Sequence, residues 1–142
     1  MTREGPFWDV VAGRVTPPPA PALLGWEPVA VDPEAGTIEV AFAATQQFLN
    51  SAGMVQGGLL AAMLDATLGT ALLATLGPGQ FAPTTDLHVQ FVRPARPGRL
   101  TGHGRVIHRG TDIAFLAGEL LDDSGQMVAA ATATAKIRAP RP

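Results

Sequence analysis

The chain of 142 residues contains no cysteine, and only 15% of its residues are charged. Without cysteine there can be neither a disulfide framework nor a thiolate metal site. The three histidines are not spaced like a pair of metal ligands on one helix, so we expect no metal (His88, His103 and His108). Hydrophobic residues make up 46% of the chain. This apolar surplus indicates that part of the surface is covered by another subunit.

The composition also disfavours several classes of protein. A net charge of −2 argues against nonspecific binding of nucleic acid. An acid and a proline interrupt residues 1–6 before any apolar run, so we expect no signal peptide and a cytoplasmic location. The apolar stretch at 57–76 is about long enough to cross a bilayer. Its central Asp65 and the lack of flanking Lys or Arg instead favour a buried helix and no membrane partner.

Proline and hydrophobic periodicity divide the chain into an extension and one domain. Residues 1–24 form a proline-rich N-terminal extension with no core of its own, and residues 25–142 are expected to form the domain. Two strand patterns precede the helix and four follow it (25–31, 36–43, 85–93, 100–108, 112–121 and 127–138). This order predicts an α+β fold in which one antiparallel sheet of five to six strands surrounds a long central helix.

Asp65 is the only charged residue between Val40 and Thr85. A buried carboxylate costs several kcal/mol unless it is paired or does chemical work. One interpretation is a structural carboxylate that backbone donors or a distant arginine satisfy. The other is a catalytic group, because a desolvated carboxylate that stays ionised can attack a carbonyl carbon or activate water.

Gly57 and Gly58 stand at the expected start of this helix. Glycine lets a ligand approach the backbone closely, and the first N–H groups of a helix have no partner within it. The Gly57 N–H is therefore a candidate to stabilise an oxyanion, although both glycines could serve packing alone. Gly57 and Asp65 are eight residues apart, about 12 Å along a helix. One carbonyl can contact both groups only if two antiparallel copies of the helix share the site.

The segment from Asn50 to Gly58, with Asp65 seven residues beyond it, resembles the active-site signature of hotdog-fold acyl-CoA thioesterases, in particular the phenylacetate-pathway (PaaI-like) type. The resemblance covers about residues 25–138 and includes the segments 84–87 and 91–95. It implies a hotdog fold and hydrolysis of an acyl- or aryl-acyl-CoA to a free acid and CoA. It also implies a homodimer or a dimer of dimers, and no cofactor beyond the CoA of the substrate.

The resemblance assigns roles to individual residues. Asp65 is the expected nucleophile or general base, and the Gly57 N–H is the expected electrophilic donor. Asn50, Gln56 and Gly58 are expected to position the substrate, and Thr84 matches a hydroxyl that assists water. A basic segment at 88–111 has five arginines and no carboxylate. It is either a solvated face of two strands or the site for the CoA phosphates, which would involve Arg93, His108, Arg109 and Gly110.

Gln56 stands where this family most often has histidine. Its amide can donate a hydrogen bond but carries no titratable proton. A noncatalytic acyl-CoA or acyl-carrier-binding module is therefore a second hypothesis. A hydratase or dehydratase is a third and weaker one, because such enzymes usually need a catalytic histidine and none precedes His88. The sequence does not indicate which acyl group is accepted. The apolar residues that could line its pocket are Phe48, Leu49, Met54, Leu60, Met63 and Leu64.

Overall fold

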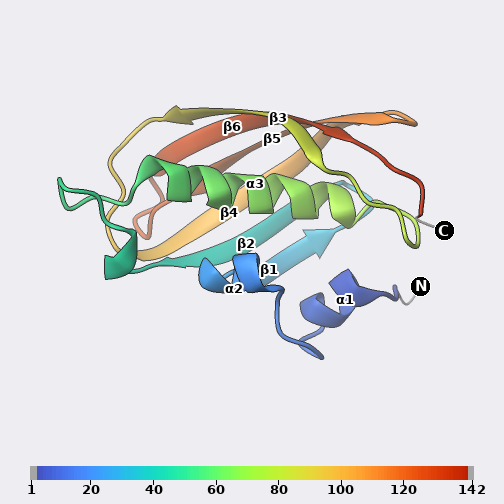
Figure 1. The fold of residues 1–142 in the computed structure, drawn as a ribbon, viewed down its shortest axis with the longest axis horizontal. Coiled ribbons are helices and arrows are strands. Elements are labelled where there is room, and N and C mark those ends of the chain that lie inside the picture. The colour runs from blue at the N-terminus through green and yellow to red at the C-terminus, as the bar shows by residue number, and fades with distance from the viewer. Residues whose placement is uncertain (1–2, 141–142) are drawn as a thin grey trace.

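The computed structural model describes residues 3–140 (Figure 1). The N-terminal extension contains two short helices, α1 (Pro6–Val11) and α2 (Pro19–Leu23). Strands β1 (Glu27–Asp32) and β2 (Thr37–Ala44) and the short 3-10 helix η1 (Gln46–Phe48) lead to the long helix α3 (Gly57–Leu73). Four strands follow: β3 (Thr84–Phe91), β4 (Gly98–Arg109), β5 (Ile113–Leu121) and β6 (Met127–Lys136). None of the described helices is long and apolar enough to cross a membrane.

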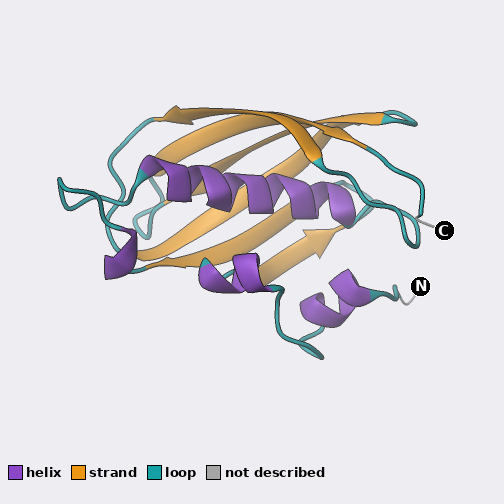
Figure 2. Ribbon diagram, in the orientation of Figure 1, coloured by secondary structure: helices purple, strands orange, loops and turns teal. Residues whose placement is uncertain are grey.

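The six strands form one antiparallel sheet in the order β1-β2-β4-β5-β6-β3. The sheet curves around α3, which lies along its concave face (Figures 1 and 2). This arrangement confirms the predicted α+β hotdog architecture. Strand β3 stands at one edge, where it pairs with β6 from Thr84↔Ala135 to Phe91↔Ala129. Its other side is unpaired within the described residues.

The core lies between α3 and the sheet. Met63, Leu64 and Leu72 of α3 are completely buried there, and each such side chain contributes about 1.5–3 kcal/mol of hydrophobic stabilisation. Strand β6 faces the helix with alternate small residues, which are buried (Ala129, Ala131, Ala133 and Ala135). Small side chains on this strand let the helix approach the sheet.

Strand β4 brings α3 still closer because two of its inward positions are glycine. A Cβ atom added at Gly102 would clash with the Thr67 side chain, and one added at Gly104 would lie 2.9 Å from the Thr67 carbonyl oxygen. Thr67 is fully buried and donates its hydroxyl to the Met63 carbonyl at 2.8 Å. The glycines thus fix the depth at which the helix packs.

The side of α3 that faces away from the sheet is uncovered for part of its length. Asp65 lies there and is exposed, so the prediction that it is buried is wrong for the single chain. The reason is geometric: one sheet covers one side of a helix, and Asp65 points to the other. Apart from Asp65 this outward side is apolar and includes Ala62, Gly69 and Leu73.

Candidate functional site

Asp65 and Thr84 form the polar contact from which the candidate site is built. The Thr84 hydroxyl, at the first residue of β3, donates a hydrogen bond of 2.8 Å to Oδ1 of Asp65, in the middle of α3. The other carboxylate oxygen, Oδ2, has no hydrogen-bond partner within residues 3–140. The carboxylate is therefore oriented through one oxygen and available for chemistry through the other.

The N-terminus of α3 presents unpaired backbone donors. Gln56 is the N-cap residue, and its carbonyl accepts the N–H groups of Leu59 and Leu60 at 2.9 and 3.3 Å. The N–H groups of Gly57 and Gly58 have no acceptor in the described part of the chain. Together with the dipole of a long helix, these two donors favour an anion or a developing negative charge.

The two glycines differ in their surroundings. A Cβ atom at Gly57 would lie 3.2 Å from the ring of Phe91, whereas one at Gly58 would meet nothing within 4 Å. Phe91 is itself 55% exposed. The helix terminus is thus open over Gly58 and flanked by an exposed aromatic ring.

The loop before α3 is shaped by Asn50. Its Oδ1 accepts the N–H groups of Ala52 and Met54 at 2.9 and 3.2 Å, which closes the turn and leaves the side-chain NH2 group for another partner. The Gln56 N–H donates to the Phe48 carbonyl at 2.8 Å. The Gln56 side chain is exposed and makes no hydrogen bond within residues 3–140. The NH2 group of Asn50 and the whole amide of Gln56 are therefore available to a ligand at the start of the helix.

Asn50, Gly57 and Arg93 line one pocket of about 420 Å³, whose walls include Phe91. An adjoining pocket of about 450 Å³ shares Arg93 and also contains Arg96 and Arg99. Arg96 and Arg99 belong to the basic segment at 88–111 but were not among the residues predicted to bind the CoA phosphates. Their spacing of three residues in the segment 93–99 was the available signal. Three arginines that line one pocket suit phosphate, although Nη1 of Arg93 also donates to the Met127 carbonyl at 3.2 Å.

Two aspartates, Asp122 and Asp123, line the same arginine pocket. The hydroxyl of Ser124 and the N–H of Gln126 donate to Asp122 and lower the pKa of its carboxyl, and the nearby Arg93 charge lowers it further. Asp122 is thus held in its charged form beside Arg93 and partly balances the charge of the arginines.

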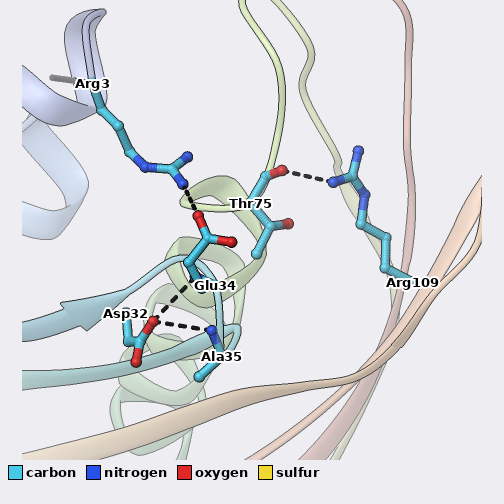
Figure 3. Close-up of polar contacts among 6 residues, drawn as sticks. All are labelled: Arg3, Asp32, Glu34, Ala35, Thr75 and Arg109. Atoms are coloured by element: carbon cyan, nitrogen blue, oxygen red, sulfur yellow. Dashed lines mark hydrogen bonds and ion pairs between the residues drawn. The ribbon is translucent and has the colours of Figure 1, made fainter. Parts of the chain in front are cut away.

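The turn after β4 lies at the other end of α3. Arg109 donates from Nη1 to the Thr75 carbonyl at 2.6 Å, just beyond the helix C-terminus (Figure 3). It also donates from Nη2 to Oε1 of Gln80 at 3.4 Å. The Gly110 N–H donates to the Ile113 carbonyl at 2.8 Å. The 17 residues of α3 separate this end from Gly57 by about 25 Å.

The structure therefore gathers the predicted site residues into three places. Asp65 is hydrogen-bonded to Thr84, and Asn50, Gly57 and Arg93 line one pocket. The segment 108–110 lies apart from both. Of the apolar residues expected to line an acyl pocket, Met54 and Leu60 border the 420 Å³ pocket. Others belong to the core and are at most 5% exposed (Phe48, Met63 and Leu64). No group of three potential ligand side chains within residues 3–140 is arranged to hold a metal ion.

Comparison with known proteins gives consistent matches. The family model of the Thioesterase superfamily matches residues 52–129. A crystal structure from Ralstonia eutropha JMP134, provisionally named a thioesterase and phenylacetic acid degradation-related protein, is 42% identical. The match covers 92% of this chain and 98% of that one with a TM-score of 0.87.

Two more distant proteins extend the comparison. The Escherichia coli PaaI protein, from the phenylacetic acid degradation operon, shares the fold with a TM-score of 0.82, 21% identity and 94% coverage of each chain. SSO2140 of Saccharolobus solfataricus, provisionally named an esterase, is 28% identical over 98 residues, which are 69% of each chain.

Proposed function

This chain belongs to the thioesterase superfamily, and from that membership we propose that it hydrolyses acyl-CoA to a free acid and CoA at a site shared by two subunits. The observation that carries the proposal is the Thr84–Asp65 hydrogen bond. It holds a carboxylate on the open side of α3 with one oxygen unengaged, which is the arrangement that a nucleophile or general base requires.

The shared site follows from the separation of Gly57 and Asp65. They are eight residues apart on α3, about 12 Å along its axis, so one carbonyl cannot contact both in the same subunit. A two-fold axis that sets two α3 helices antiparallel places Gly57 of each beside Asp65 of the other. The apolar outward side of the N-terminal half of α3, which includes Ala62, and the unpaired edge of β3 support this association, since both are surfaces that a second copy would cover.

In the proposed reaction, Asp65 of one subunit acts on a thioester carbonyl held by the Gly57 N–H of the other. As a base, its free oxygen accepts a proton from water while the water oxygen bonds to the carbonyl carbon. The carbonyl oxygen becomes an oxyanion, which the Gly57 N–H stabilises. Collapse of this intermediate breaks the C–S bond, and the CoA sulfur takes the proton from Asp65. As a nucleophile, Asp65 would instead bond to the carbonyl carbon and expel the CoA thiolate, which takes a proton from solvent. Water would then hydrolyse the resulting anhydride, releasing the acid and restoring the Asp65 carboxylate.

The remaining residues of the site bind substrate in this proposal. The amides of Asn50 and Gln56 orient the thioester at the helix N-terminus. The arginine pocket beside them, with Arg93, Arg96 and Arg99, takes the CoA phosphates. In the antiparallel pair the segment 108–110 of one subunit comes beside the loop that precedes α3 in the other, so it is a second candidate for the phosphates.

The experiment that tests the proposal is thiol release from an acyl-CoA panel (phenylacetyl, benzoyl, hexanoyl and decanoyl) by the wild type and by Asp65→Asn. We expect hydrolysis of at least one member by the wild type and a loss of about 10²-fold or more in the variant. Calorimetric titration with CoA should show unchanged binding. If neither protein hydrolyses any member while both bind CoA, the noncatalytic acyl-CoA-binding module becomes the better account.

A further inference from the structure

The N-terminal extension packs against the domain only in part: Phe7 and Val10 of α1 contact the core, and clefts remain beside them. No residue of α1 or α2 is buried. Two adjoining cavities, both bordered by Phe7 and Leu73, separate α1 from the C-terminal end of α3. Their volumes are about 640 and 440 Å³. Both cavities are partly open to solvent, and clefts of about 300–1,000 Å³ are typical of ligand sites.

The smaller cavity is apolar. It is lined by Val10 and Val15 of the extension, by Trp26, and by Thr70 and Leu73 of α3, and no charged side chain within residues 3–140 borders it. It therefore favours a hydrocarbon occupant. The larger cavity differs, since Arg3, Glu4 and Gln80 are among its walls.

The extension is tied to the domain at its start. Arg3 forms an ion pair of 2.7 Å with Glu34 in the turn between β1 and β2, and Asp32 accepts two backbone N–H groups of that turn (Figure 3). The Arg3 guanidinium also lies over the Trp8 ring, 5.5 Å from its centroid. The contacts of Arg3 thus hold α1 at the rim of the two cavities, which the apolar side chains of α1 help to line.

The apolar cavity lies on the same row of α3 as the proposed catalytic carboxylate. Asp65, Gly69 and Leu73 follow one another at spacings of four residues, so they form one row on the outward side. Gly69 leaves this row open, because a Cβ atom there would meet nothing within 4 Å. From Asp65 to Leu73 the row covers eight residues, about 12 Å along the helix.

We infer that this cavity binds the distal end of the acyl chain, and that the preferred substrates are aliphatic acyl-CoA esters of about ten carbons. The inference rests on the proposed function, which places the thioester carbonyl beside Asp65. An extended chain advances about 1.2 Å per bond, as three bonds of peptide backbone span about 3.3–3.6 Å. About ten bonds therefore reach Leu73, whereas hexanoyl and phenylacetyl groups end short of the cavity.

A matched pair of variants tests this inference. Val10 lines the apolar cavity, and Val11, the next residue of α1, lines neither cavity. We expect the wild type to hydrolyse decanoyl-CoA with a kcat/KM about tenfold or more above that for hexanoyl-CoA. Val10→Trp should abolish that preference and leave hexanoyl-CoA turnover within about twofold, which also shows that the variant folds. Val11→Trp should keep the wild-type profile.

Calorimetric titration with decanoate separates this inference from the proposed function. Binding of decanoate by the wild type and by Val11→Trp, with a loss of about tenfold or more in Val10→Trp, supports the cavity even if no thioester is hydrolysed. Hydrolysis with the same chain-length profile in all three proteins overturns the inference but still supports the proposed thioesterase activity. Absence of decanoate binding by the wild type, with no effect of Val10→Trp on any substrate, also overturns it.

Discussion

The Thr84 hydroxyl and the Asp65 carboxylate are joined by a hydrogen bond of 2.8 Å, although 19 residues separate them in the chain. The bond links the outward side of the central helix to the edge strand of the sheet. The bond engages Oδ1 alone, so a single neighbour orients the carboxylate and Oδ2 stays available. In the proposed reaction this makes Thr84 a positioning residue for Asp65.

Replacing Thr84 by valine should therefore lower kcat about tenfold and change KM little. Valine keeps the shape of the side chain but removes the donor, so Asp65 loses its fixed orientation. The folded protein should lose about 1.5–3 kcal/mol at most, the usual range for a hydrogen bond to a charged group. Steady-state kinetics check the prediction, and Thr84→Ser is the control that should restore kcat. A Thr84→Ser variant as slow as Thr84→Val would show that the hydroxyl does not act through this bond.

The Gly57 N–H can be removed without removing the helix. Gly57 is the first residue of α3, where proline is well tolerated, and Gln56 has φ −58° and ψ 132°, which suit a residue before proline. Gly57→Pro should lower kcat about 10²–10³-fold, the usual effect of losing one oxyanion donor. Gly57→Ala is the matched control. It adds the same Cβ atom 3.2 Å from the Phe91 ring but keeps the N–H, and its kcat should fall less than tenfold. Equal losses in both variants would assign the effect to the Phe91 contact.

The close packing of α3 on β4 predicts a steric penalty at Gly102. Gly102→Ala places a Cβ atom against the Thr67 side chain, and such overpacking costs about 1–3 kcal/mol. The added substitution Thr67→Ala removes the opposing atoms, so the double variant should be more stable than the sum of the two single changes. Urea unfolding of the four proteins measures this coupling. Gly69→Ala, on the open side of the same helix, should be neutral or stabilising by up to about 1 kcal/mol.

Asp122 should make stability depend on pH in acid. Its folded-state pKa is lowered from 3.8, chiefly by the Ser124 hydroxyl. The carboxylate therefore stabilises the folded state above pH 3.8 and loses that effect as the pH falls through the lowered pKa. Asp122→Asn should be less stable than the wild type near neutral pH, and the two should converge in stronger acid. Urea unfolding of the wild type and Asp122→Asn, near neutral pH and in acid below pH 3.8, tests this. A difference in stability between the two proteins that does not change with pH would contradict it.

Local patterns in the sequence were sufficient to predict the fold. Alternation along β2 and β6 and the apolar run of α3 are visible within single segments, so all six strands and the helix were placed within a few residues. The helix was expected to reach residue 76 but ends at Leu73. Beyond that residue the Thr75 carbonyl accepts a hydrogen bond from Arg109. This contact joins segments far apart in the chain, so no local pattern reveals it.

The surroundings of Asp65 were harder to predict, for a physical reason. An apolar run indicates burial but does not indicate whether the cover comes from the same chain or from another. The sheet buries Met63 and Leu64 and leaves the neighbouring Asp65 exposed. The contact of Gly102 with Thr67 and the cavities beneath α1 likewise depend on long-range packing.

The central claim is that each active site takes Asp65 from one subunit and the Gly57 N–H from the other. The most direct test mixes two inactive variants, Asp65→Asn and Gly57→Pro, under conditions in which subunits exchange. Half of the reassembled dimers would be mixed, and one of the two sites in each mixed dimer would be intact. We therefore predict recovery of about a quarter of the wild-type rate of thiol release. No recovery despite demonstrated subunit exchange, or full activity in a stable monomer, would contradict the shared site.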